Sequence, residues 1–161
     1  KGNQCMDSRT RVVVYAGTIA ATYVVLTLAL APISYGPLQF RVSEMLKPLA
    51  LFHPAFAVAF GIGTGMSNLF SPFGPWDYIA MAIVDMVAAY VCWLMRRWTW
   101  AALAVQAIII SAGVALFPLG FGGGFPFLPT FGAVLVSQLV LLFVGYGVIW
   151  RKYGAYLLRS R

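Results

Sequence analysis

Apolar residues along this chain fall into six runs, separated by short segments rich in polar residues, glycine or proline. The first run holds 20 residues without a charge, and about 20 apolar residues are enough for a helix to cross a bilayer. The second and third runs are shorter, because His53-Pro54 and a proline-rich turn interrupt them. The pattern therefore predicts an all-α integral membrane protein with six transmembrane helices, of which the second and third are short. The runs cover residues 12–31, 42–52, 55–70, 76–95, 98–119 and 127–150.

The segments outside these runs predict turns and tails. Glycine and proline gather at residues 32–41, 71–75 and 120–126, where they are typical of irregular connections. We expect a polar tail at residues 1–11, one membrane domain at residues 12–150 and a basic tail at residues 151–161.

Composition supports a membrane location. The chain is 61% hydrophobic and 9% charged, with a mean hydropathy of +0.86, far from the average of soluble domains. The net charge of +7 does not predict nucleic-acid binding, because the basic residues stand at the ends of apolar runs instead of forming one patch. Nine of the eleven fall on one side of a six-crossing chain, which is then cytoplasmic in a cell membrane, with both termini. These nine are Lys1, Arg9, Arg11, Arg96, Arg97, Arg151, Lys152, Arg159 and Arg161.

Several kinds of chemistry are not predicted. Cys5 and Cys92 are 87 positions apart, and we expect neither a disulfide nor a metal site from them. The lone histidine, His53, lies near the inner end of a short helix, away from the acidic residues, so no catalytic set is expected and the protein is not predicted to be an enzyme. The chain also has no G-x-x-x-x-G-K-[S/T] phosphate loop, so we expect it to borrow the energy for any active transport.

The stretch from residue 40 to 85 concentrates the polar chemistry. It holds three of the four acidic residues of the chain, and ionisable groups in a membrane are costly enough to be read as a functional site by default. With a rise of about 1.5 Å per residue, Glu44, Asn68 and Asp77 are predicted near the outer helix ends, and Asp85 about 12 Å deeper. Gln138 reaches a similar depth from the sixth run. Ser111 and Gln106 lie at the middle and inner levels of the fifth, and Tyr78 is expected on the same helix face as Asp85. Such a convergence in the outer half suits a solute captured from outside.

Each of these residues also has a plain structural interpretation. Arg41, Glu44 and Lys47 are three residues apart and could pair along one helix face. Asp77 could cap a helix, Asp85 could be a protonated or hydrogen-bonded packing residue, and Asn68 could hold the turn that follows it. His53 is expected at a helix boundary, and Gln106 and Gln138 could join helices by hydrogen bonds. The tryptophans Trp93, Trp98, Trp100 and Trp150 are typical of an inner aromatic belt.

A resemblance to a known family rests on this stretch. The string Phe40-Arg41-Val42-Ser43-Glu44-Met45-Leu46 is followed by Leu51-Phe52-His53-Pro54, a glycine-rich helix to Asn68, Ser71-Pro72 and Trp76-Asp77. Together these resemble the QueT family, substrate-binding subunits (S components) of energy-coupling factor transporters assigned to precursors of queuosine. In the first run, Ala16 and Ala20 resemble the A-x-x-x-A signature by which S components dock on their shared coupling subunit.

The resemblance implies a six-helix S component with a cytoplasmic amino terminus and no cofactor of its own. Two ATPase subunits would supply energy through the coupling subunit. The implied ligand is a 7-deazaguanine, such as the aminomethyl or cyano form, whose paired N–H donors suit a carboxylate and whose ring oxygen suits a donor. The carboxylate candidates are Glu44, Asp77 and Asp85, and the donor candidates are Asn68, Gln138 and Arg41. Tyr35, Phe40, Trp76 and Tyr78 are candidate walls, which Phe125 and Phe127 could close.

Two alternatives stay open. An S component for another vitamin or nucleobase-like ligand would keep the architecture and change the substrate. A membrane assembly protein without a ligand would explain the small-residue helix faces, but not the polar residues gathered in the outer half.

Overall fold

The computed structural model describes residues 8–35 and 40–151, and within these ranges the chain is helical and contains no strand. This confirms the predicted all-α class. In chain order the elements are α1 (Ser8–Ala29), α2 (Ala31–Ser34), η1 (Val42–Leu51), α3 (Ala55–Asn68), η2 (Trp76–Ala80), α4 (Met81–Leu94), η3 (Arg96–Trp98), α5 (Thr99–Leu116), η4 (Phe117–Gly122), α6 (Phe127–Val144) and η5 (Gly145–Trp150).

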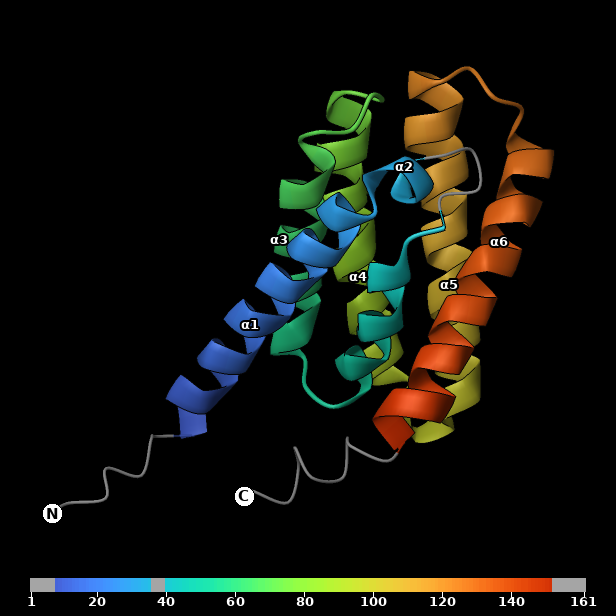
Figure 1. Ribbon diagram of the computed structural model, residues 1–161. Helices are drawn as coiled ribbons and strands as arrows, with labels where there is room; N and C mark the ends of the chain where they lie inside the picture. The colour runs from blue at the N-terminus through green and yellow to red at the C-terminus, as the bar shows by residue number, and fades with distance from the viewer. Residues whose placement is uncertain (1–7, 36–39, 152–161) are drawn as a thin grey trace, which may run out of the picture.

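The helices form a bundle in which η1 lies at the centre. Figure 1 shows η1 running between α1 and α6, in front of α4, and it contacts all three. Around it, α1 packs on α3, α3 on α4, α4 on α5, and α5 on α6. The start of α1 and the end of η5 lie at the same end of the bundle (Figure 1).

Within the described ranges, four helical segments are long and apolar enough to cross a membrane: Arg9–Ala29, Trp76–Leu94, Arg96–Gly122 and Phe127–Val148. By contrast, η1 has 10 residues and α3 has 14, so the short second and third helices of the sequence-based prediction are present. The count of six crossings stays a prediction, because these two elements are below the usual length.

The central element η1 is a 3-10 helix and not the α-helix that the sequence suggested. Pro48 lies inside it and has no N–H to donate to the preceding turn. A 3-10 helix has three residues per turn and rises about 2.0 Å per residue, so residues three apart stand directly above one another. Glu44 and Lys47 therefore stand one above the other on η1, Arg41 precedes them as the N-cap residue, and all three members of this row are buried.

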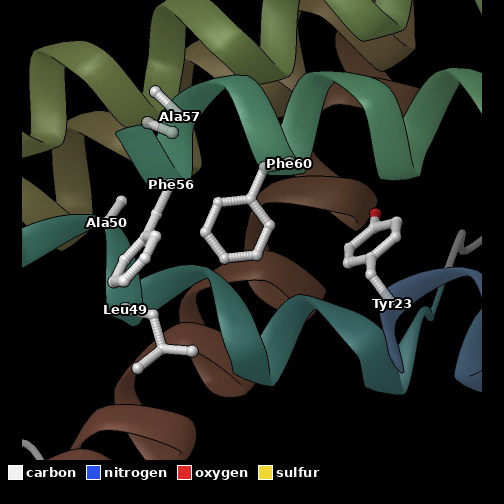
Figure 2. Close-up of a cluster of buried hydrophobic side chains, with 7 residues drawn as sticks. Tyr23, Leu49, Ala50, Phe56, Ala57 and Phe60 are labelled. Carbon is white, nitrogen blue, oxygen red and sulfur yellow. The ribbon is translucent and has the colours of Figure 1, made fainter. Parts of the chain in front are cut away.

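The described helices hold three apolar clusters, of which the first two include residues of η1. Figure 2 shows the first, in which Phe56 and Phe60 of α3 lie beside Leu49 and Ala50 of η1, with Tyr23 of α1 next in line. The second cluster comprises Leu51, Cys92, Ala102, Leu103, Ala107 and Leu142. The third cluster comprises Met81, Ala88, Ile110, Val114, Leu119 and Val134.

Candidate functional site

Five buried polar side chains from four helices meet around the ammonium of Lys47, and we call them the lysine cluster. Lys47 Nζ lies 2.6 Å from Glu44 Oε2 and 2.7 Å from Asp85 Oδ2. The Tyr23 hydroxyl donates to Glu44 Oε1 at 2.5 Å, and the Thr64 hydroxyl donates to Asp85 Oδ2. The cluster thus ties α1, η1, α3 and α4 together through one cation and two carboxylates.

The lysine cluster corrects the predicted depth of Glu44. Because Lys47 contacts both carboxylates, Glu44 and Asp85 lie at one level and not about 12 Å apart along the membrane normal. The reason is the path of the chain into η1. Arg41 is already buried, and the steep rise of the 3-10 helix carries Glu44 about 6 Å further into the bundle.

A second set, which we call the arginine cluster, comprises Tyr35, Arg41, Asn68, Ser71 and Asp77. Arg41 Nη1 donates to Asn68 Oδ1 at 2.8 Å, and Arg41 Nη2 lies 3.5 Å from Asp77 Oδ1. Asn68 Nδ2 donates to Asp77 Oδ1 at 2.8 Å, and the Ser71 hydroxyl donates to Asp77 Oδ2. The guanidinium, the amide and the carboxylate therefore form a closed triangle between η1, α3 and η2.

Tyr35 covers this triangle. Its hydroxyl donates to the Ser67 carbonyl at 2.6 Å, and the guanidinium carbon of Arg41 lies 5.5 Å from the centre of its ring, within the range of a cation–π contact. Burial raises the pKa of the Tyr35 phenol, while Arg41 acts against this rise and Asp77 adds to it. The phenol therefore stays a hydrogen-bond donor.

These contacts decide between the plain interpretations of the charged residues. Asp77 does not cap its helix; its carboxylate binds Asn68, Ser71 and Arg41 instead. Glu44 and Lys47 do pair along η1, as their spacing suggested, but Arg41 pairs with Asp77 on another helix. Asn68 does more than hold its turn, because its side chain joins the guanidinium to the carboxylate.

Two of the predicted aromatic walls lie elsewhere. Trp76 is 47% exposed and packs on Phe117 and Phe121, with ring centres 6.4 Å and 5.6 Å away. Tyr78 lines an apolar groove between α3 and α4 together with Ala82 and Met86. The cause is η2, a π-helical turn at Trp76–Ala80, because a wider turn shifts the register so that Asp77 is buried and Tyr78 is not.

The remaining predicted residues take several positions. Phe40 is half-buried at the start of η1, and Phe125 and Phe127 are each 44% exposed. His53 lies between η1 and α3, where its Nδ1 accepts the Ala55 N–H at 3.1 Å, as expected of a boundary histidine.

The two alanines of the docking signature, Ala16 and Ala20, are half-buried. Ala16 packs against the first cluster, and the Ala20 carbonyl lies close to Gly63 of α3. Their role in docking stays a prediction.

Three buried polar residues of α5 and α6, which we call the polar layer, contrast with the two clusters. Gln106, Ser111 and Gln138 are at most 1% exposed. Among the described residues, both amide atoms of Gln106, the hydroxyl of Ser111 and Oε1 of Gln138 have no hydrogen-bond partner, and neither has Oδ1 of Asp85. The predicted hydrogen bond between helices through Gln106 is therefore wrong within this part of the chain.

Several members of the site escaped sequence reasoning. Tyr23 and Thr64 lie in apolar runs where a tyrosine or a threonine is common, and only their buried contacts with Glu44 and Asp85 identify them. Tyr23 and Thr27 are one turn apart on α1, and the Thr27 hydroxyl lies 2.7 Å from that of Ser43. This spacing of polar groups was the one available signal that α1 faces η1.

The site is suited to binding a polar ligand. Among the described residues, no group of three or more histidine, cysteine, aspartate or glutamate residues is placed to hold a metal ion. Its ionisable members are already paired, while several amide, hydroxyl and carboxylate atoms are open to a polar ligand.

Comparisons with known proteins agree with this interpretation. The family model described as QueT transporter matches residues 13–152. A curated relative from Lactococcus lactis subsp. cremoris (strain MG1363), named "Queuosine precursor transporter QueT", is 32% identical over 152 residues, which cover 86% of this chain and 89% of that protein. No solved structure shows a significant match.

Proposed function

The chain belongs to the QueT transporter family, and on this premise we propose that it captures a queuosine precursor, a 7-deazaguanine, from outside the cell. Membership makes the chain a multi-pass membrane transporter and not an enzyme, as the sequence predicted. The precursor is taken from the name of the Lactococcus lactis relative.

The observation that carries the substrate proposal is a set of buried polar groups with open hydrogen-bonding capacity inside an apolar bundle. A 7-deazaguanine is flat and presents N–H donors beside a ring carbonyl. Carboxylate and amide oxygens can accept from the donors, and an amide N–H can donate to the carbonyl. Buried polar groups of this kind fix the orientation of a ligand in an otherwise apolar site.

We further propose that the protein acts as the substrate-binding subunit of an energy-coupling factor importer. In this arrangement η1 and α3 complete six crossings, both termini are cytoplasmic in the cell membrane, and a coupling subunit with two ATPase subunits supplies the energy. The sequence resemblance supports this, as does the absence of a phosphate loop from the sequence. The shared end of the bundle at which α1 begins and η5 ends agrees with an even number of crossings (Figure 1).

Equilibrium binding to the purified protein in detergent tests the substrate. The panel contains the aminomethyl and cyano 7-deazaguanines, guanine, riboflavin, thiamine and biotin. We expect saturable binding of a 7-deazaguanine and no binding of the three vitamins. Binding of a vitamin alone would show that the vitamin, and not a 7-deazaguanine, is the substrate. A folded sample that binds nothing in the panel would refute the proposal.

Co-purification tests the coupling. Co-expressed with a coupling subunit and its ATPases, the tagged protein should retain all three through size-exclusion chromatography. Its isolation without them, while an S component known to use the same module retains them, would contradict the proposal.

A further inference from the structure

The polar layer lies at the boundary between two apolar clusters. Gln106 is one helical turn from Leu103 of the second cluster and one turn from Ile110 of the third. On α6, Gln138 is one turn from Leu142 of the second cluster and one turn from Val134 of the third. The two glutamines therefore share one level of the bundle.

Ser111 and Asp85 belong to the same region. Ser111 is one turn from Ala107 of the second cluster and Val114 of the third. Asp85 of α4 is one turn from Met81 and Ala88, two members of the third cluster. The polar layer and Asp85 thus border the same apolar cluster, between helices α4, α5 and α6.

Open hydrogen-bonding atoms in this position are costly to keep. An amide or hydroxyl that leaves water without gaining a partner destabilises a fold, and most buried polar groups in proteins do have partners. Gln106 has both its side-chain donor and its side-chain acceptor open. A cyclic amide could satisfy both, because its N–H would donate to Oε1 and its C=O would accept from Nε2.

The carboxylates of the two clusters differ in their availability. Both oxygens of Glu44 are engaged, by Tyr23 and Lys47. Asp77 has both oxygens bound as well, by Asn68 and Ser71. Asp85 alone among them keeps an oxygen, Oδ1, that has neither a hydrogen-bond partner nor an ion-pair partner in the described chain, and this oxygen is the carboxylate atom that can still accept from a ligand.

The buried charges also do not balance. Of the buried aspartate, glutamate, lysine and arginine residues that the structure describes, three are acidic, Glu44, Asp77 and Asp85, and two are basic, Arg41 and Lys47. An uncompensated charge inside a membrane protein is strongly unfavourable. A ligand with one positive charge beside Asp85 would remove the excess.

We propose that the polar layer and Oδ1 of Asp85 form the ligand-reading site, and that it takes a flat heterocycle with a cyclic amide edge and one protonated amine. This inference rests on the proposed function and narrows it. Gln106 and Gln138 read the amide edge and Asp85 holds the amine through Oδ1, while the other members of the lysine cluster and the arginine cluster position the helices. Within the proposed substrates, the aminomethyl form is then favoured over the neutral cyano form.

Isothermal titration calorimetry on the full-length protein in detergent tests both parts. The wild type should bind the aminomethyl 7-deazaguanine at least tenfold more tightly than the cyano form, and more tightly than an aminomethyl analogue without the ring carbonyl. Gln106→Leu and Gln138→Leu should each weaken binding of the aminomethyl form at least tenfold. Their melting temperatures should stay the same or rise, because leucine removes buried polar atoms that lack partners, both amide atoms of Gln106 and Oε1 of Gln138. Ser137→Ala is the matched control, since this neighbouring hydroxyl is already satisfied by the Ala133 carbonyl, and it should bind as the wild type does.

The outcomes separate this inference from the proposed function. A wild type that binds no 7-deazaguanine refutes the function and the inference with it. A wild type that binds, with both glutamine variants within twofold of it, overturns the inference alone. Equal affinity for the cyano and aminomethyl forms overturns the inference that the ligand is cationic, and this comparison needs no variant to fold. Melting temperatures that fall in both glutamine variants would show amides paired within the folded protein, and would also overturn it.

Discussion

Removing the charge of Lys47 should be among the most damaging single changes to this fold. Lys47→Met keeps most of the length of the side chain but leaves Glu44 and Asp85 buried without the cation that lies 2.6 Å and 2.7 Å from them. Breaking a buried ion pair by removing one partner costs about 3–5 kcal/mol. For a chain of this size, that corresponds to a fall in melting temperature of about 6–20 °C.

The same reasoning predicts a rescue. The triple variant Glu44→Gln, Lys47→Met, Asp85→Asn has no buried charge in the lysine cluster, and replacing a whole buried ion pair by neutral groups is often close to neutral for stability. The hydroxyls of Tyr23 and Thr64 would still have side-chain oxygens to donate to. We therefore expect the triple variant to regain most of the stability that Lys47→Met loses.

Thermal unfolding in detergent, followed by intrinsic fluorescence and by loss of the monomer peak, measures both effects. Arg97→Met is the control, because Arg97 is an exposed basic residue of η3 and should change the melting temperature by less than about 2 °C. If Lys47→Met lowers the melting temperature no more than Arg97→Met does, the ion pairs of Lys47 contribute nothing to the stability of the fold. A triple variant less stable than Lys47→Met would refute the explanation by uncompensated charge.

Three further predictions follow from other contacts. Asn68→Leu should lower the free energy of unfolding by about 3 kcal/mol, since it leaves a buried guanidinium and a buried carboxylate without their shared partner; chemical denaturation measures this, and a loss below about 1 kcal/mol would contradict it. In a Cys5→Ser background, Cys92 should resist a maleimide until the protein unfolds, because its side chain is fully buried; rapid labelling of folded protein would count against the packing of α4 on α5. Gly145→Ala should lower the free energy of unfolding by about 1–3 kcal/mol, because the added Cβ would lie 2.6 Å from a backbone oxygen of η1. Gly132→Ala is the control; it has open space around it, and its effect on stability should be neutral or favourable. Equal melting temperatures of the two variants would show that η1 and η5 do not meet closely.

The sequence predicted the helix boundaries well because their signals are local. His53-Pro54 and the proline-rich turn at residues 71–75 mark chain breaks wherever they occur, and the observed ends of η1 and α3 lie within two residues of those expected. The residues that gather in the site were also largely foreseen, since a charge in an apolar run is conspicuous.

The arrangement of the site could not be predicted, because it depends on helix type and on distant partners. The 3-10 geometry of η1 set the depth of Glu44, and the π-helical turn of η2 buried Asp77 in place of Tyr78. The pairing of Lys47 with Asp85 joins residues 38 positions apart in the chain. No local pattern distinguishes that partner from another carboxylate.

The row of Arg41, Glu44 and Lys47 has a consequence for how this family can vary. One residue inserted or deleted within the row would rotate everything beyond it by about 120° and carry a buried charge to an apolar face. Substitutions could be tolerated there one at a time, but a change of length could not. Insertions and deletions should instead collect at exposed turns such as those around Gly74 and Gly124, where the backbone already adopts a positive φ and no side chain approaches.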